Sequence, residues 1–275
     1  MPLSAPFPDL DELLATIGEA GQRLSHINAG EGAAGNISIC IGWPIEVRRR
    51  FPLASPIELP HPVPRLAGHA VLVTGSGRRL RDIRADPARN LCAVTVAEDG
   101  ATAQMHTVPG AVFERPTSEF NSHLAVHGDQ VERTGTNFHA IIHAQPPHLT
   151  YLSHIPEYRD ERVLNERLLR WEPETIVNLP RGIGVIPFIL PGSPELMQAT
   201  IVSLRTHRVT LWSKHGVMAR SDVSATRAAD RVEYAETAAR YEYMDMVNHG
   251  RAEGLTREEL RSVVAAFHVE TELLG

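Results

Sequence analysis

The stretch Gly30-Glu-Gly-Ala-Ala-Gly-Asn-Ile-Ser-Ile-Cys40 joins two segments of different periodicity. Upstream, apolar side chains recur at helical spacing from Leu10 to Ile27, and Asp9 is placed to cap this helix, which we expect to end near residues 28–30. Downstream, residues 36–40 alternate polar and apolar side chains, as a half-buried strand does. The stretch therefore predicts mixed α and β structure, and its glycine turn is suited to hold an anion such as phosphate.

The rest of the chain also alternates strand and helix patterns, with no evident linker or internal repeat. We therefore expect one domain over residues 1–275. Six prolines and three consecutive arginines predict a long surface excursion over residues 43–68. Strands are predicted at 71–74, 92–96, 139–143 and 209–213, and helices from a Thr117-Ser118 cap to about 130, from a Ser193 cap to 207, from an Asp222 cap to 246, and from a Thr256 capping box.

Composition excludes several classes of protein. The chain has 275 residues, 43% of them hydrophobic, and a formal charge of −6. This size supports a large core, and the acidic balance argues against a nucleic acid or an anionic membrane as partner. No apolar run reaches the roughly 20 residues of a membrane span, and Cys40 and Cys92 are too few for a disulfide framework. Acidic residues occupy the first helix where a secretory signal is basic, so we expect a cytoplasmic protein.

A second glycine turn, Thr74-Gly-Ser-Gly77, follows a predicted strand, and Glu119 follows the predicted Thr117-Ser118 cap. Glu119 is either a carboxylate that stabilises the helix dipole or a general acid/base. His123 and His127 follow it on the same helix face. This stripe of three residues either binds a metal ion or is a packed, hydrogen-bonded face.

The strand at 139–143 ends in His143-Ala-Gln145, and His215 follows a later strand. Residues two apart on a strand point to the same side, so His143 and Gln145 could grip one metal ion together with a ligand from elsewhere. We expect His143 and His215 to lie within a few ångströms of each other.

Taken in order, these pieces resemble the class II aldolase and adducin superfamily, and within it the rhamnulose-phosphate branch. The resemblance covers roughly residues 20–247. It rests on Gly35-Asn36-Ile-Ser38, Val73-Thr-Gly-Ser-Gly77, Arg81-Asp82, Asp86-Pro87, Asn90-Leu91, Pro116-Thr-Ser-Glu119, Ile142-His143, Glu174, Gly182-Ile-Gly184, Ile186-Pro187, Pro191-Gly192, Gln198-Ala-Thr200 and His215-Gly-Val217.

The resemblance implies an α/β sandwich with a central, mostly antiparallel sheet flanked by helices, assembled as a homotetramer with a zinc ion. It implies cleavage of L-rhamnulose 1-phosphate, or a similar ketose 1-phosphate, to dihydroxyacetone phosphate and L-lactaldehyde through a metal-stabilised enediolate. Glu119 and Glu174 would move protons or position the aldehyde. His143 and His215 would bind the metal, and the substrate would be held by Asn36, Ser76, Gly77, Thr117 and Ser118.

Two departures from the pattern bear on this interpretation. Gln145 stands where the family has a second histidine, and Ala33 stands where the branch has an asparagine. A glutamine carbonyl is a hard oxygen donor, better suited to Mn²⁺ or Mg²⁺ than to Zn²⁺. We do not expect His139 or His148 to substitute for the missing imidazole. One alternative is the same fold with altered or lost lyase activity, acting on a different substrate or serving as a non-catalytic binding module. Another is a structural oligomer with histidines in packing roles.

Overall fold

In a computed structural model, which describes residues 2–275, the chain forms a nine-stranded sheet in the order β2-β5-β4-β3-β1-β6-β9-β8-β7. Neighbouring strands are antiparallel except for the parallel pair β7 and β8. The strands are β1 (Asn36–Ile41), β2 (Leu53–Glu58), β3 (Ala70–Thr74), β4 (Leu91–Val96), β5 (Thr102–Thr107), β6 (Phe138–Ala144), β7 (Ile183–Ile186), β8 (Val209–Trp212) and β9 (Gly216–Ser221).

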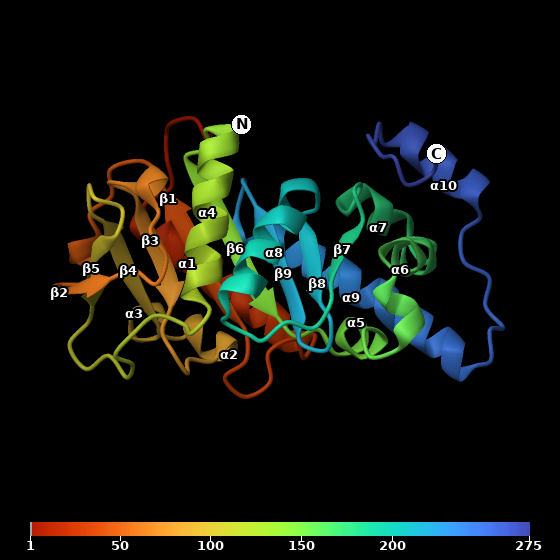
Figure 1. Cartoon of the computed structure of the whole chain (residues 1–275), viewed down its shortest axis with the longest axis horizontal. Coiled ribbons are helices and arrows are strands. Elements are labelled where there is room, and N and C mark those ends of the chain that lie inside the picture. Colours follow the sequence, from red (N-terminus) through yellow and green to blue (C-terminus); the bar gives the residue numbers. More distant parts are fainter. Residues whose placement is uncertain (1) are drawn as a thin grey trace.

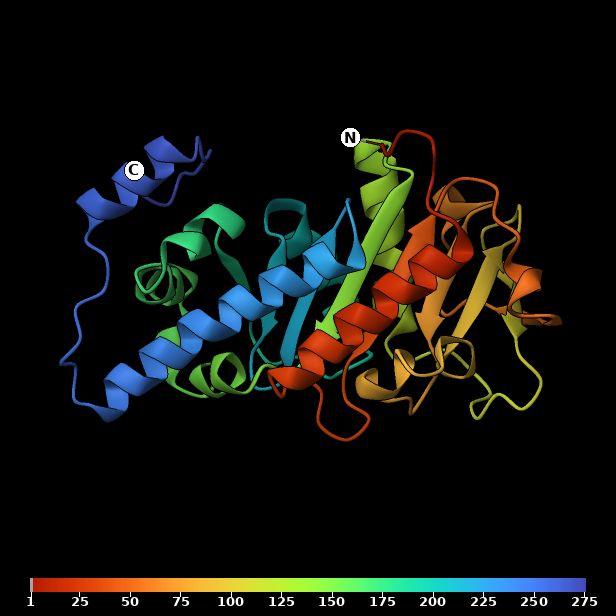
Figure 2. The same cartoon turned by 180° about the vertical axis from the view of Figure 1, so that it is seen from behind.

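Helices cover both faces of this sheet. In Figure 1, α4 and α8 lie in front of it, and in Figure 2, α1 and α9 cross the opposite face. The α-helices are α1 (Leu10–His26), α2 (Leu80–Ile83), α3 (Pro87–Asn90), α4 (Phe120–Thr134), α5 (Pro147–Leu152), α6 (Glu161–Leu168), α7 (Pro173–Asn178), α8 (Pro194–Thr206), α9 (Ala225–Val247) and α10 (Arg257–Ala266). The predicted sandwich with a mostly antiparallel sheet is confirmed.

The central strand β1 separates two cores. Ile37, Ile39 and Ile41 face α1 and α9 in the larger core, whereas Cys40 belongs to the core on the α4 side. All six residues of β1 are buried, so the expectation of a half-buried strand is wrong. The polar members, Asn36 and Ser38, face hydrogen-bonding side chains of α4 rather than water.

Several helix signals hold. Asp9 caps α1 in a capping box with Glu12, and Ser193 caps α8. Two predicted caps are wrong by a few residues: Ser224 rather than Asp222 caps α9, and Glu119 itself is the N-cap residue of α4. The Glu119 side chain makes no capping hydrogen bond, so its carboxylate is free for another role.

The excursion at 43–68 contains a strand that the sequence analysis missed. β2 pairs with β5, itself not predicted, at one edge of the sheet. Pro56 lacks an N–H group, and an edge strand tolerates that loss because one side of it has no partner strand. Proline density indicated irregular structure here because the pairing partner is distant in sequence.

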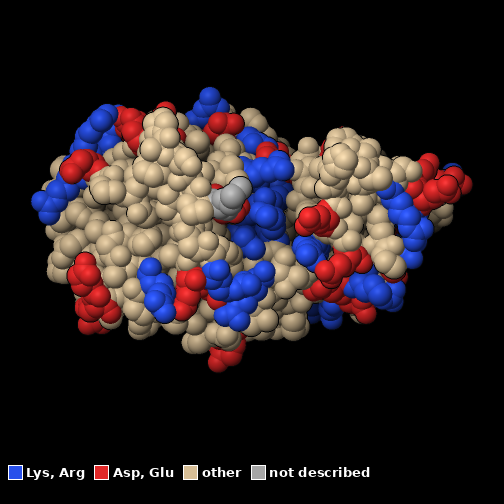
Figure 3. Space-filling view, turned by 90° about the horizontal axis from the view of Figure 1, so that it is seen from above, with Lys and Arg blue, Asp and Glu red and all other residues tan. Residues whose placement is uncertain are grey.

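Figure 3 shows from above the end of the molecule that is uppermost in Figure 1, where charged side chains of both signs are scattered over a surface formed mostly by other residues. Basic side chains gather there in one cluster near the middle of the view. Within residues 2–275, no helix combines the length and apolar character that a membrane crossing requires.

Candidate active site

A cavity of about 250 Å³ lies where strands β3 and β6 end and β1 begins. These strand ends are at the bottom of the sheet as drawn in Figure 1. The cavity brings together residues from six separate segments of the chain. Nine predicted site residues line it: Asn36, Ser76, Gly77, Thr117, Ser118, Glu119, His143, Gln145 and His215. Ala33, the second departure from the family pattern, also lines it.

Glu174 is the predicted site residue that lies elsewhere. It is exposed on α7, and it is not part of the cavity lining. Figure 1 places α7 near the C-terminal end of the chain, beside α6 and α10. Its catalytic role stays a prediction.

Glu119 lies between two imidazoles. The Nε2 atoms of His143 and His215 are each 3.6 Å from a Glu119 carboxylate oxygen, Oε2 and Oε1 respectively. One ligand atom from each of the three residues lies within 4.8 Å of the others. The expected proximity of His143 and His215 is therefore confirmed.

The fold sets the orientation of His143. Its Nδ1–H donates to the carbonyl oxygen of Val217 on β9 at 2.9 Å, which leaves a lone pair on Nε2 facing Glu119. The ring of Trp212 lies 4.8 Å from that of His143 and 5.2 Å from that of His215. A metal-binding histidine is commonly oriented in this way by its second nitrogen.

Burial and neighbouring charges set the protonation states of Glu119 and His215. Burial raises the pKa of the Glu119 carboxyl, but His143, the hydrogen bond from Asn36 and His215 outweigh it, so the pKa lies below its ordinary value. Burial, followed by the neighbouring His143, lowers the pKa of His215 to about 4. Near neutral pH, Glu119 is therefore an anion and His215 offers a free lone pair.

These three residues fit a divalent cation. Ligands about 2.0–2.2 Å from one ion in a tetrahedral site lie roughly 3.3–3.5 Å apart, and the two Glu119 to histidine separations of 3.6 Å are close to this. The donor set of two imidazoles and a carboxylate is one that Zn²⁺ and similar ions accept.

Gln145 lies in the same cavity, with its side chain beside Gly216, which adjoins His215. Neither of the other histidines near this strand replaces the missing imidazole. The His148 ring bonds to Glu236 at 2.6 Å, and the His139 ring bonds to His127 at 2.8 Å. Gln145 therefore has no histidine substitute among these candidates.

The Gly75-Ser76-Gly77 turn differs from its expected form. Its backbone N–H groups at Gly75 and Ser76 donate to the carbonyl oxygens of Asn90 and Arg115, each at 2.9 Å. These two N–H groups are not free for an anion, whereas the hydroxyl-bearing residues Ser76, Thr117 and Ser118 line the cavity. Gly77 has a φ of +71°, a conformation that glycine adopts readily.

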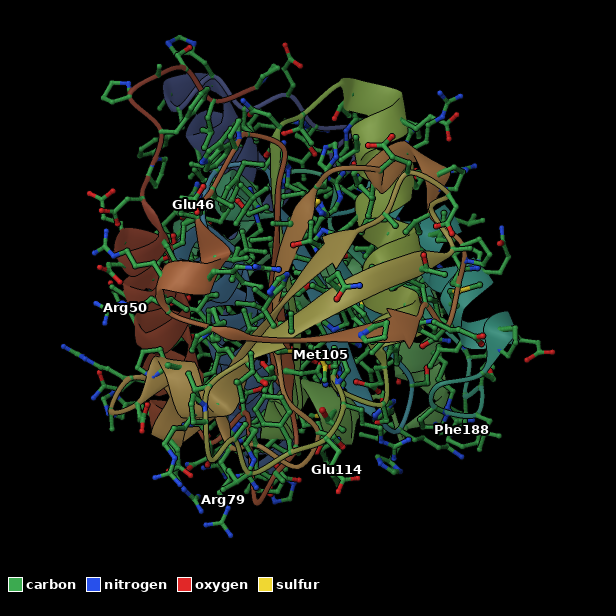
Figure 4. The ribbon with its side chains drawn as sticks, turned by 90° about the vertical axis from the view of Figure 1, so that its left-hand side faces the viewer. Glu46, Arg50, Arg79, Met105, Glu114 and Phe188 are labelled. Atoms are coloured by element: carbon green, nitrogen blue, oxygen red, sulfur yellow. The ribbon has the colours of Figure 1, made fainter. Side chains whose placement is uncertain are left out.

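Arg78 is a site residue that the sequence analysis missed. It lines the cavity next to Ser76 and Gly77, and its buried Nε atom has no hydrogen-bond partner among residues 2–275. Its neighbour Arg79 extends from the bottom of the molecule in Figure 4, away from the sheet. An arginine directly after a glycine turn was the available signal, since guanidinium groups pair well with phosphate.

The stripe formed by Glu119, His123 and His127 is not a metal site. Only Glu119 belongs to the cluster of possible ligands found among residues 2–275. His123 and His127 are fully buried and bond to Ser38, at 2.6 and 2.7 Å. The second alternative, a packed and hydrogen-bonded face, is the one observed.

The comparison with protein families bears on the same residues. The family model for the class II aldolase and adducin N-terminal domain matches residues 15–243, which include β1 to β9, α4 and the whole cavity lining. The chain belongs to this family.

The chain is also similar to individual members of this family in sequence and in structure. Rhamnulose-1-phosphate aldolase of Bacteroides thetaiotaomicron is 29% identical over 265 residues, 95% of this chain and 96% of the relative. Its counterpart from Escherichia fergusonii is 33% identical over 78% of this chain and 77% of its own length. The crystal structure of a sugar-phosphate aldolase from Thermotoga maritima superposes with a TM-score of 0.75 at 29% identity, covering 89% of this chain and 98% of the other.

The buried histidines make stability sensitive to acid. Burial lowers the pKa of His123 and His139 to about 3, and that of His127 well below 6.5. The unfolded chain binds protons at these residues below about pH 6.5, whereas the folded chain does not. We expect the free energy of unfolding to fall as the pH drops from about 6.5 toward 3, by up to about 1.4 kcal/mol per pH unit for each histidine.

Urea unfolding between pH 7.5 and 5 measures this slope. His139→Leu should reduce the pH dependence of the unfolding free energy by the contribution of one buried histidine. His268→Gln, at an exposed position, should leave that pH dependence unchanged. An identical slope in His139→Leu and the unmodified protein would contradict the assignment.

Proposed function

We propose that this chain is a metal-dependent aldolase that cleaves L-rhamnulose 1-phosphate, or a similar ketose 1-phosphate, to dihydroxyacetone phosphate and L-lactaldehyde. The observation that carries the proposal is the Glu119 carboxylate held between the imidazoles of His143 and His215 in a polar cavity. Relatives named rhamnulose-1-phosphate aldolase, about 30% identical along most of the chain, support this substrate.

We assign the phosphate and the reacting carbons of the substrate to different residues of the cavity lining. Ser76, Thr117 and Ser118 carry hydroxyl donors, and Arg78 carries the positive charge that a phosphate ester needs. Asn36 and Glu119 lie toward His143, where the dihydroxyacetone unit would sit. Ala33 contributes no side-chain donor, which makes Arg78 more important for the phosphate.

Glu119 is the candidate for proton transfer. When the carbon–carbon bond breaks, its electron pair remains on the dihydroxyacetone carbon, which must then take up a proton. The Glu119 carboxylate, which is an anion near neutral pH, would take up the proton that the substrate hydroxyl group loses as this bond breaks and return it to that carbon. In the reverse direction it would remove the proton from the carbon. Glu174 would act on the aldehyde, although it is exposed and is not part of this cavity's lining.

His143 and His215 would hold the cation, with Gln145 as a further oxygen ligand. When bound, a divalent cation there supplies positive charge beside the ketone oxygen, which favours electron density on the adjacent carbon. The histidines suit Zn²⁺, whereas the Gln145 carbonyl suits Mn²⁺ or Mg²⁺. We further propose a cytoplasmic homotetramer, as the resemblance implies.

A second candidate keeps the cavity but has a different or lost lyase activity. It is favoured by Gln145 and Ala33, both of which line the site. The two candidates differ in whether dihydroxyacetone phosphate is released from L-rhamnulose 1-phosphate, which a coupled assay detects directly.

Glu119→Gln should lower kcat by roughly two to four orders of magnitude, because the amide cannot exchange a proton with the substrate carbon. The coupled assay measures the rate, and circular dichroism confirms that the fold persists. Glu114→Gln is the matched control, since Glu114 is exposed at the bottom of the molecule in Figure 4. An unchanged rate in Glu119→Gln would remove this residue from proton transfer.

Arg78→Met should raise KM by roughly 10- to 100-fold with a smaller effect on kcat, because a hydrogen bond to a charged group contributes about 1.5–3 kcal/mol. Arg79→Met changes the neighbouring arginine, which lies outside the cavity lining, and should leave KM within about twofold. Equal KM values for the two variants would contradict a phosphate contact at Arg78.

Gln145→His should restore two imidazoles on one face of the strand end, and so raise both zinc retention and the rate of cleavage. Zinc content and dihydroxyacetone phosphate release are measured side by side in the unmodified and variant proteins. A variant that gains zinc without any cleavage of L-rhamnulose 1-phosphate would favour the second candidate.

A further inference from the structure

A column of buried polar side chains leads from Glu119 into the interface between α4 and the sheet. Its members come from β1, α4 and β6, and all are at most 6% exposed. In order from the cavity inward they are Asn36, His123, Ser38, His127 and His139.

Each member is hydrogen-bonded to the next. Asn36 Nδ2 lies 2.9 Å from Glu119 Oε2, and Asn36 Oδ1 lies 2.5 Å from His123 Nε2. Ser38 Oγ lies 2.6 Å from His123 Nδ1 and 2.7 Å from His127 Nε2. His127 Nδ1 and His139 Nδ1 are 2.8 Å apart.

One arrangement of donors and acceptors satisfies all these bonds. A carboxylate only accepts hydrogen bonds, so Asn36 must present its NH₂ group to Glu119 and its carbonyl oxygen to His123. His123 must then carry its proton on Nε2, which leaves Nδ1 to accept the hydroxyl proton of Ser38.

The same reasoning extends to the end of the column. Ser38 Oγ, having donated to His123, accepts from Nε2–H of His127. His127 Nδ1 then accepts from Nδ1–H of His139. The His139 Nε2 atom is left as a bare acceptor, and it is buried without a partner among residues 2–275. An unpaired acceptor there is more tolerable than an unpaired buried N–H group.

We propose that His123, Ser38 and His127 are positioning residues that hold the Asn36 amide in one orientation and thereby fix the Glu119 carboxylate in the cavity. The inference rests on the proposed aldolase function only for its consequence on turnover. The column does not conduct protons to the cavity, because the Asn36 amide between Glu119 and His123 cannot pass a proton on. Its effect is on orientation.

The consequence is specific to the chemical step. Without the Ser38 hydroxyl, His123 loses the donor that selects its tautomer, and the Asn36 amide can rotate its oxygen toward Glu119. Repulsion between that oxygen and the carboxylate would move Glu119 away from the reacting carbon. The phosphate-binding hydroxyls and Arg78 take no part in these bonds, so substrate affinity should change little.

Ser38→Ala tests the column against a matched control, Ser221→Ala. Both serines are fully buried on strands. The Ser221 hydroxyl accepts two hydrogen bonds, from the backbone N–H groups of Val223 and Ser224, which follow the end of β9. We expect Ser38→Ala to lower kcat by roughly 10- to 100-fold with KM within about twofold, and to slow solvent hydrogen exchange into dihydroxyacetone phosphate equally. Ser221→Ala should leave both rates near those of the unmodified protein.

A second pair of variants separates positioning from packing. His123→Gln retains an N–H donor for the Asn36 oxygen, whereas His123→Leu has a similar size and no donor. We expect His123→Gln to keep most of the turnover and His123→Leu to lose it. Equal losses in the two variants, or a Ser38→Ala loss no larger than that of Ser221→Ala, would overturn the proposal.

Ring ¹⁵N spectra of the unmodified protein test the column without any substrate. They should show His123 and His127 as neutral Nε2–H tautomers and His139 as the Nδ1–H tautomer; the opposite tautomer at His123 would overturn the proposal. If the spectra show these tautomers while L-rhamnulose 1-phosphate is not cleaved, the substrate assignment fails and the positioning column stands.

Discussion

The structure depends on how it accommodates one buried carboxylate. Glu119 is 6% exposed, and a charge so placed is costly unless hydrogen bonds and compensating groups surround it. Asn36 donates to it from β1, and the imidazoles of His143 and His215 flank it from the ends of β6 and β8. Three separate strands must therefore meet at the first turn of α4, and the order of the sheet brings them there.

This requirement explains the two faces of the central strands. On β1 and β6, alternate residues enter an apolar core against α1 and α9, and the residues between them face α4. Because α4 carries histidines one turn apart, the strand positions opposite them are polar, and Ser38 bonds to both rings. Each polar side chain in such a buried interface needs its hydrogen-bond partner, because an unpaired polar group there is costly. A polar residue on α4 therefore requires a polar residue at the facing strand position. The cavity stands at the end of this interface, where the polar residues reach solvent.

Much of the fold could be read from local signals. The Asp9 cap, the Ser193 cap and the alternation in residues 36–40 located α1, α8 and β1 within a few residues. The failures share a cause. β2 and β5 form through pairing between distant segments, and the burial of Asn36 depends on a helix that begins 84 residues later at Phe120 (120 minus 36). A local sequence pattern predicts neither the β2–β5 pairing nor the burial of Asn36, because both depend on contacts between residues distant in sequence.

By itself, the sequence indicated the family and nine of the residues that line the cavity, because the order of its motifs along the chain resembles that of the family. Only the tertiary structure decided which of them act together. It placed Arg78 in the cavity and Glu174 outside the cavity lining, and it paired the N–H groups of Gly75 and Ser76 with backbone carbonyls. It also joined His123 and His127 to Ser38, although the sequence left a metal site open for them. The physical reason is that hydrogen bonds and ligand sets depend on distances of a few tenths of an ångström, which only the packing of helices on the sheet establishes.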